Sequence, residues 1–183
     1  MKKRGISIEN MIKIAMMTAV LAVMSVIQIP APSGVPFTLQ TFGVALCGYM
    51  LGAKKGGMAV MLYLIAGMAG LPVFSGMKGG FGVLAGPTGG FLVGFPGMVI
   101  LSGAGAAAGK GRIKAVLGFL GLCVCHGCGT VWFSLIMNQS LKASFLLVSL
   151  PYLAKDIVSV AGAILVSEAL KKRLARAGLP QKM

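Results

Sequence analysis

The chain has 183 residues, of which 57% are hydrophobic and only 11% are charged, and it contains 28 glycines. Because a soluble domain is typically about 25% charged, this composition excludes an ordinary soluble globular protein. Intrinsic disorder is also excluded, since it requires low hydrophobicity and high charge density. The mean hydropathy of +0.92 and the length predict a single helical membrane domain over residues 1–183.

The charge is strongly unbalanced, with 17 lysines and arginines against three acids, for a formal net charge of +14. In a soluble protein this balance would suggest nucleic-acid binding. In a membrane protein the bases mark the cytoplasmic ends of the spans, where they meet anionic headgroups. One Trp and three Tyr provide few aromatics for a nucleic-acid surface. We therefore predict the lipid bilayer, and no nucleic acid, as a partner.

The first apolar segment follows a basic stretch, as it would in a signal peptide. However, the sequence after it, Pro30-Ala31-Pro32, is not a small-x-small cleavage site. We interpret residues 11–29 as a retained first transmembrane helix, preceded by a short cytoplasmic N-terminus of residues 1–10. Pro30, Pro32 and Pro36 predict a rigid external connection after this helix, because each proline fixes φ and lacks an N–H.

The second and third apolar segments, residues 37–51 and 57–70, are separated by Gly52 and the pair Lys54 and Lys55. Both are shorter than the roughly 20 residues that span a bilayer core about 30 Å thick. Residues 71–86 are apolar but glycine-rich and predict a poor helix, since each interior glycine costs about 1 kcal/mol relative to alanine. Irregular backbone at membrane depth is tolerated where it is buried in protein or lines a cavity. This extracellular loop between helices 3 and 4 is therefore a candidate binding site.

The second half of the chain predicts three more spans. Residues 86–90 open a fourth helix that runs to about residue 108 (Pro87 suits a helix N-terminus). A fifth helix covers residues 115–137, a polar turn residues 138–142, a sixth helix residues 145–170, and a basic tail residues 171–183. With six spans and an internal N-terminus, only Lys78, Lys142 and Lys155 of the 17 bases lie outside. This positive-inside asymmetry predicts a cytoplasmic-membrane protein with both termini in the cytoplasm.

Asp156 is the most informative residue, because it lies near the start of the sixth apolar segment. An ionisable group inside a span costs about 2.5–3.5 kcal/mol on insertion scales and suggests function. The alternative is a local ion pair or an interfacial cap. As the only acid predicted in the outer half, Asp156 is a candidate acceptor for ligand N–H groups. Lys155 and Lys78, the nearest outer cations, either pair with Asp156, attract a ligand carboxylate, or snorkel to the membrane surface.

Ala15, Ala19 and Ala22 form a stripe of small residues on the first helix, at spacings i, i+4 and i+7. Such a stripe lets another helix approach closely in lipid. From spacing alone, that second helix belongs equally well to a partner protein or to this chain.

A cluster of Cys123, Cys125, His126 and Cys128 contains the ligand types of a zinc site. At about 100° per residue, however, the three thiols spread around a helix, so packing is the better interpretation. The glycine-rich segment 103–111 lacks the G-x-x-x-x-G-K-[ST] of a phosphate-binding loop. The sequence also shows no nucleophile–base constellation. We predict no enzyme activity, metal or cofactor in this chain.

Three segments resemble the BioY family, the biotin-specific substrate-binding (S) components of energy-coupling-factor (ECF) transporters. They are VPFTLQTFGVALCGYMLG (35–52), GLPVFSGMKGGFGVLAGPTGGFLVGF (70–95) and PYLAKD (151–156). The resemblance covers nearly the whole chain. It implies an all-α integral membrane protein of six transmembrane helices that binds biotin near the extracellular side. It also implies docking on a transmembrane coupling subunit driven by two cytoplasmic ATPase subunits, with no ATPase activity in this chain.

The resemblance also indicates which residues to expect in the site. The ureido ring of biotin carries two N–H donors, for which Asp156 is a suitable acceptor. On the first helix, the stripe Ala15/Ala19/Ala22 matches the face that S components present to the coupling subunit. The family's sixth helix usually has a Lys three residues after the Asp, where this chain has Ser159. The expected substrate-binding residues are Asp156, Lys155, Tyr152, Lys78, Phe74, Phe81, Thr38, Gln40 and Thr88.

Two other function classes are consistent with the residues. One is a self-sufficient secondary carrier or channel for biotin or a related small vitamin. The other is a membrane enzyme that uses the Cys/His cluster.

Overall fold

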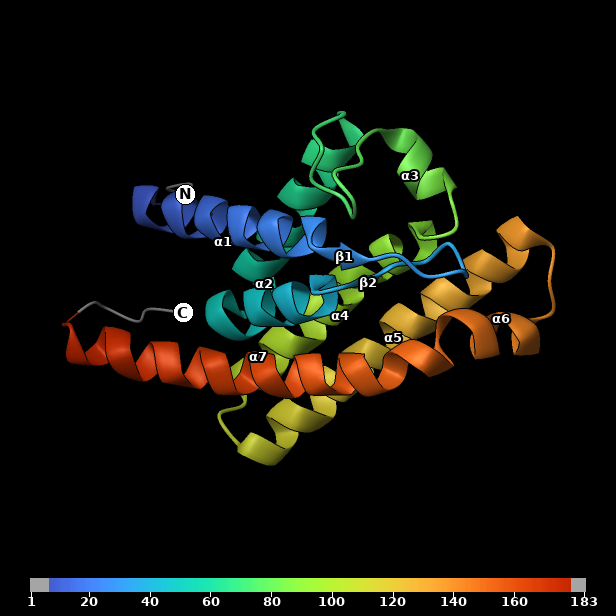
Figure 1. Cartoon of the computed structure of the whole chain (residues 1–183). Coiled ribbons are helices and arrows are strands. Elements are labelled where there is room, and N and C mark those ends of the chain that lie inside the picture. Colours follow the sequence, from blue (N-terminus) through green and yellow to red (C-terminus); the bar gives the residue numbers. More distant parts are fainter. Residues whose placement is uncertain (1–6, 179–183) are drawn as a thin grey trace, which may run out of the picture.

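The chain folds into a mostly helical assembly in a computed structural model that describes residues 7–178 (Figure 1). Three of the described helices, α1, α4 and α5, are long and apolar enough to cross a membrane. The predicted bases Lys2, Lys3, Arg4 and Lys182 lie outside the described residues. The elements in chain order are α1 (Ile8–Val26), β1 (Gln28–Ile29), β2 (Phe37–Thr38), α2 (Gln40–Met68), α3 (Phe81–Ala85), α4 (Gly89–Ala107), α5 (Gly111–Met137), α6 (Leu141–Val148) and α7 (Leu150–Arg176).

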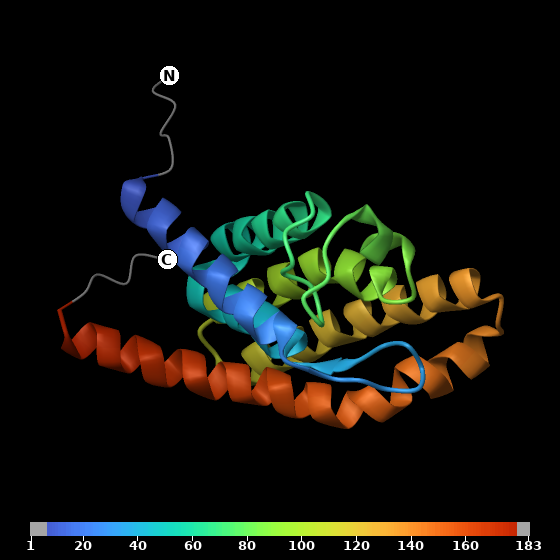
Figure 2. The ribbon, with the colours of Figure 1, turned by 45° about the horizontal axis from the view of Figure 1, so that its top comes forward.

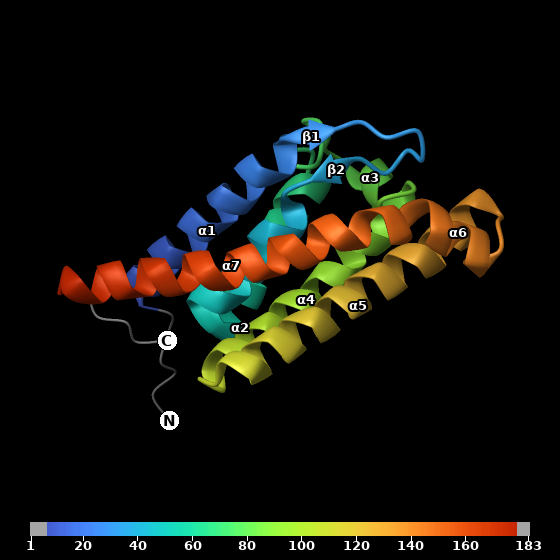
Figure 3. The ribbon, with the colours of Figure 1, turned by 60° about the horizontal axis from the view of Figure 1, so that its bottom comes forward.

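The two ends of the molecule differ in structure. The start of α1, the α4–α5 turn and the end of α7 gather at one end, whereas the β1–β2 hairpin, α3 and α6 lie at the other (Figures 2 and 3). An ion pair of 2.6 Å between Lys114 and Glu168 joins the start of α5 to the end of α7. The predicted inner bases near these elements therefore lie at the end opposite the hairpin.

Helix α4 packs at backbone distance against both of its neighbours. A Cβ on Gly94 would lie 2.7 Å from the Cα of Cys125 in α5, and one on Gly103 would lie 2.2 Å from the backbone nitrogen of Ala53 in α2. Small residues at such crossings bring helices together in lipid, where no hydrophobic driving force acts between them. The largest fully buried side chains of the helical core include Leu21, Val44, Tyr49, Val60, Tyr63, Met98, Val99 and Leu122.

The second and third apolar segments form two helical arms, together labelled α2, that meet at a sharp reversal of the chain. Gly52 has φ 76° and ψ 175°, in agreement with the predicted stop, but residues 53–56 are already helical again. A Cβ on Gly56 would lie 2.7 Å from the carbonyl oxygen of Cys47. In a straight helix nine residues span about 13.5 Å, so the chain must reverse sharply at Gly52. The result is two arms, residues 40–51 and 53–68.

Three connections also differ from the sequence prediction. The proline-rich connection closes a hairpin, in which Gln28 pairs with Thr38 and Ile29 with Phe37. The glycine-rich segment 71–86 contains the one-turn helix α3. The predicted sixth helix begins earlier and is interrupted at Ser149, between α6 and α7. Pro151 explains this interruption, because it has no N–H to continue the helical hydrogen bonding of α6.

Candidate functional site

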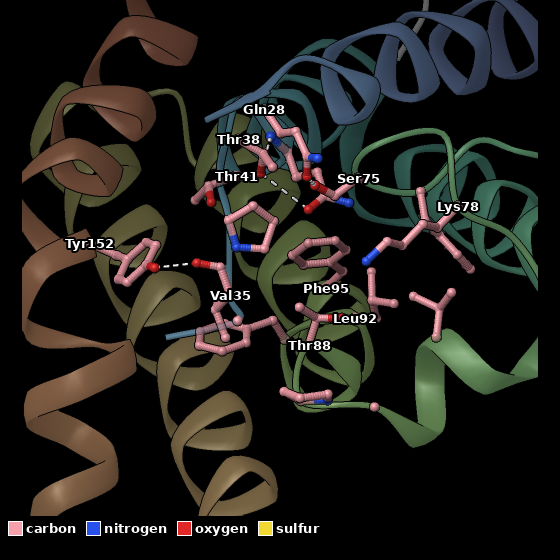
Figure 4. Close-up of a pocket in the computed structure, with 18 of the residues that line it drawn as sticks. Gln28, Val35, Thr38, Thr41, Ser75, Lys78, Thr88, Leu92, Phe95 and Tyr152 are labelled. Atoms are coloured by element: carbon pink, nitrogen blue, oxygen red, sulfur yellow. Dashed lines mark hydrogen bonds between the residues drawn. The ribbon is translucent and has the colours of Figure 1, made fainter. Parts of the chain in front are cut away.

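A cavity of about 420 Å³ lies at the hairpin end of the molecule. Its walls come from the β1–β2 hairpin, the glycine-rich loop, the starts of α2, α4 and α7, and the middle of α5 (Figure 4). This volume falls within the roughly 300–1,000 Å³ of small-molecule sites, which combine an apolar lining with a few fixed polar groups. The apolar part of the wall includes Phe74, Val83, Phe91, Leu92 and Phe95.

Asp156 and Lys155 form a paired acid and base in the cavity wall. The Asp156 residue is only 4% exposed, yet it lines the cavity together with Lys155. Lys155 Nζ contacts Asp156 Oδ1 and donates a hydrogen bond of 2.9 Å to the carbonyl oxygen of Thr38. Adjacent helical side chains point about 100° apart, so the long stem of Lys155 is what brings the two charges together. Asp156 is therefore both an ion-pair partner and a lining residue.

A polar chain continues from Asp156 into α5. His126 Nε2 lies 3.1 Å from Asp156 Oδ2, and His126 Nδ1 lies 3.1 Å from Ser149 Oγ. Ser149 Oγ is in turn 2.7 Å from Thr130 Oγ1. The sequence pattern assigned the Cys/His cluster, which includes His126, to packing. It missed the contact with Asp156, for which the two positions, 30 residues apart, gave no local signal.

The start of α2 contributes polar groups that are held in place by neighbours. Gln40 Nε2 donates to Ser25 Oγ and Tyr63 OH, both at 2.8 Å. Thr38 Oγ1 donates to Gln40 Oε1 at 3.2 Å. Thr38 and Gln40 both line the cavity as expected, and the structure adds Thr41 beside them.

Tyr152 lines the cavity and ties the hairpin to α7. Its ring stacks on Phe37 with centroids 4.2 Å apart and an interplanar angle of 17°. Its hydroxyl donates to the carbonyl oxygen of Val35 and lies 2.9 Å from Ser33 Oγ (Figure 4). These contacts hold both the ring and the hydroxyl of Tyr152 against the hairpin.

The glycine-rich loop covers another side of the cavity. Gln28 Oε1 accepts a 2.5 Å hydrogen bond from Ser75 Oγ, which links the loop to the hairpin. Lys78 extends its ammonium group into the cavity (Figure 4). Within residues 7–178, Lys78 forms no ion pair. Thr88 lies at the start of α4 and also lines the cavity.

The two phenylalanines of this loop have different positions. Phe74 is buried against Tyr63, with ring centroids 5.4 Å apart, and lines the cavity. Phe81 is 70% exposed and lies outside the lining, contrary to the expectation that it would enclose a ligand. It begins α3, where positions 81 and 83 are about 200° apart, and Val83 takes the inward face.

The alanine stripe on α1 is divided between two environments. Ala15 and Ala19 are exposed, while Ala22 is half-buried and packs against the core. The stripe thus has one residue in contact with the chain itself and two on an uncovered helix face. The buried face of α1 consists of Ile14, Met17, Leu21 and Ser25.

The cysteines of α5 point in different directions. Cys123 is exposed, Cys125 is buried, and Cys128 is half-buried. Cys125 Sγ donates to the carbonyl oxygen of Phe91, 3.7 Å away. In the described part of the chain, no three His, Cys, Asp or Glu side chains are grouped as metal ligands would be.

Comparison with known proteins agrees with this geometry. The BioY family model matches residues 1–176. The chain is 36% identical over 137 residues to a probable biotin transporter BioY of Pyrococcus horikoshii, covering 75% of this chain and 81% of that protein. It is 35% identical over 160 residues to the biotin transporter BioY2 of Lactococcus lactis, covering 84% of each.

The fold also matches a crystal structure of the S-component for biotin from an ECF-type ABC transporter. The TM-score is 0.82 at 25% sequence identity, and the match covers 90% of this chain and 92% of that one. The family match over nearly the whole chain, the related membrane transporters and the shared fold lead to one conclusion: this chain is a membrane protein and belongs to the BioY family.

Proposed function

We propose that this protein binds biotin in the cavity at the hairpin end and takes it up across the cytoplasmic membrane as the S component of an ECF transporter. The observation that supports this most is the placement of Asp156 and Lys155 as a buried pair in the wall of a largely apolar cavity. The family membership and the names of the relatives point to the same ligand.

The hydrogen-bonding capacity of the pair complements a ureido group. A carboxylate offers about four lone-pair sites and an ammonium three N–H donors. Asp156 accepts from Lys155 and His126, and Lys155 donates to Asp156 and Thr38. Thr41 also lies within hydrogen-bonding reach of Asp156, so Asp156 keeps capacity for at least one ureido N–H group, and Lys155 keeps one N–H for the ureido carbonyl.

Lys78 and the aromatic wall suit the rest of the ligand. The fused bicycle of biotin is compact and apolar, and Phe74, Phe91 and Phe95 offer surface of the same character. Lys78 extends into the cavity from the loop and is free to pair with the ligand carboxylate. In this orientation the ureido ring lies beside α7 and the carboxylate lies beneath the glycine-rich loop.

The proposed membrane topology has six crossing segments. They are α1, the two arms of α2, α4, α5 and α7. The cavity end faces outside, and the end that contains the α4–α5 turn and the end of α7 faces the cytoplasm. The bases at this inner end support that orientation, because positively charged residues are retained on the cytoplasmic side.

In this proposal, partner subunits supply the ATP hydrolysis that drives release on the cytoplasmic side. We propose a transmembrane coupling subunit that contacts the exposed alanines of α1, and two cytoplasmic ATPase subunits that drive reorientation. Ala15 and Ala19 leave the helix face flat enough for close helix packing in lipid.

Titration calorimetry with the detergent-purified protein tests the ligand. We expect biotin to bind more tightly than desthiobiotin, and unrelated vitamins not to bind. Equal heats for biotin and an unrelated vitamin would contradict the proposal. Reconstitution into liposomes tests the mechanism, since we expect biotin uptake only when the coupling and ATPase subunits are present. Uptake by the protein alone would instead identify a secondary carrier or channel.

A further inference from the structure

Behind Asp156 lies a chain of three buried polar side chains, His126, Ser149 and Thr130, to which the proposed function assigns no contact with the ligand. It runs from Asp156 to His126, Ser149 and Thr130, with separations of 3.1, 3.1 and 2.7 Å. All four residues are buried. Both ring nitrogens of His126 face protein partners, so although the ring lines the cavity it has no polar atom left for a ligand.

The acid at one end determines where each proton lies. An ionised carboxylate only accepts hydrogen bonds, so the proton of the imidazole is on Nε2 and is donated to Asp156. In the neutral ring Nδ1 then accepts, and Ser149 must donate its hydroxyl hydrogen to it. Ser149 Oγ accepts in turn from Thr130. This single direction of hydrogen bonding holds His126 in one tautomer.

The carboxylate plane of Asp156 is fixed from both sides. The terminal torsion of an Asp side chain is broad, so a carboxylate with one partner rotates readily. Here Lys155 holds Oδ1 and His126 holds Oδ2. The remaining lone pairs are thereby kept in a constant direction before a ligand arrives. Such preorganisation lowers the entropy that binding must otherwise overcome.

We infer that His126 is a positioning residue for ligand recognition, which orients the carboxylate of Asp156 toward the ureido N–H groups. Ser149 and Thr130 do not contact Asp156, but their hydrogen bonds hold the imidazole of His126 in the tautomer that donates to Asp156. This inference rests on the proposed function, because it assumes that Asp156 accepts hydrogen bonds from biotin.

Two substitutions of His126 separate hydrogen bonding from packing. His126→Phe keeps a ring against Phe91, which now lies at 5.7 Å and 90° to the imidazole, but removes both nitrogens. We expect biotin affinity to fall at least about tenfold, as for a lost charge-assisted hydrogen bond. His126→Gln provides an amide N–H at the same distance along the side chain as Nε2. We expect it to restore affinity to within about threefold of the wild type.

A double-mutant cycle with Asp156→Asn shows whether His126 acts through Asp156. In the Asp156→Asn protein, we expect His126→Phe to weaken biotin binding by less than about threefold, because coupled residues are non-additive. The matched control is Ser167→Ala, which removes another buried hydroxyl of α7, bonded to Ile164 at 2.8 Å and away from the cavity lining. We expect this control to leave affinity unchanged.

The outcomes distinguish the inference from the proposed function. Wild-type protein that does not bind biotin would refute the function itself. If Asp156→Asn weakens biotin binding but His126→Phe does not, only the role of His126 is overturned. The same holds if the fold-losses of affinity in the two single variants multiply in the double variant. If His126→Phe is not monodisperse after purification, Thr130→Val and Ser149→Ala replace it. Each is then expected to weaken binding in the wild-type background and not in the Asp156→Asn background.

Discussion

Substitution of Asp156 by Asn is the most direct perturbation of the proposed site. The two side chains have the same shape, so the change removes a charge and one acceptor without creating a cavity. Lys155 and His126 donate to different oxygens of Asp156, so the single oxygen of the Asn amide can serve only one of them, and the NH2 group meets the donor of the other. The side chain of Lys155 is only 27% exposed, and its ammonium is then left without a counter-charge.

The expected loss follows from the hydrogen bonds that change. A hydrogen bond to a charged group contributes about 1.5–3 kcal/mol, and one between neutral groups about 0.5–1.5 kcal/mol. Replacing one carboxylate oxygen by NH2 leaves one ureido N–H group without its charged acceptor, and losing that single hydrogen bond costs about 1.5–3 kcal/mol. At about 1.4 kcal/mol per factor of ten, biotin affinity should fall roughly ten- to hundredfold.

Calorimetry on the purified variant measures this loss, and Glu168→Gln is its matched control. Glu168 is also an acid of α7 in an ion pair, 2.6 Å from Lys114, but its side chain is 43% exposed and lies at the opposite end of the molecule. The control removes the same charge, and we expect it to leave biotin affinity unchanged. Folded Asp156→Asn protein with wild-type affinity would refute the role of Asp156. An equal loss in both variants would show that net charge, and not the site, controls binding.

Three further predictions concern the cavity mouth, the partner surface and the helix packing. Lys78→Ala should weaken biotin but not biotin amide, which lacks the carboxylate charge; equal losses for both ligands would contradict the proposed orientation. Ala15→Leu with Ala19→Leu should abolish co-purification with the coupling subunit while leaving calorimetric biotin binding intact, and a complex that still assembles would assign this face to another role. Gly103→Ala should lower the thermal unfolding midpoint, because the added Cβ would lie 2.2 Å from the backbone nitrogen of Ala53 in α2. Overpacking of this kind typically lowers the free energy of unfolding by about 1–3 kcal/mol. Gly57→Ala, which meets no atom within 4 Å, is the control, and equal midpoints would contradict the close contact.

Part of the site could be predicted because its signals are local. Asp156 is conspicuous as an acid near the start of an apolar segment, and the glycine-rich loop is conspicuous as an apolar stretch that makes a poor helix. The structure places eight of the nine expected residues in the cavity lining. Phe81 is the exception, because its direction depends on the single turn of α3, and no periodic signal in the sequence predicts that turn.

Contacts between distant segments could not be read from the same patterns. Tyr152 binds the hairpin at Val35, and Lys155 binds Thr38, in each case across 117 residues of chain. His126 looked like a packing residue because its acid partner is 30 positions away on another helix. The break at Gly52 and the reversal after it were predicted from the sequence, but the angle between the two arms of α2 was not.

The sequence by itself determined the apolar segments, the breaks between them and the basic ends, and its motifs indicated the family. These properties depend on composition and short-range spacing, which act within a few residues. Only the tertiary structure decided which polar groups meet inside the protein. A buried charge or hydroxyl must find partners wherever the packing of helices brings them, so Asp156 acquired Lys155 from its own helix and His126 from α5. The apolar pattern of the sequence does not predict the contact between His126 and Asp156.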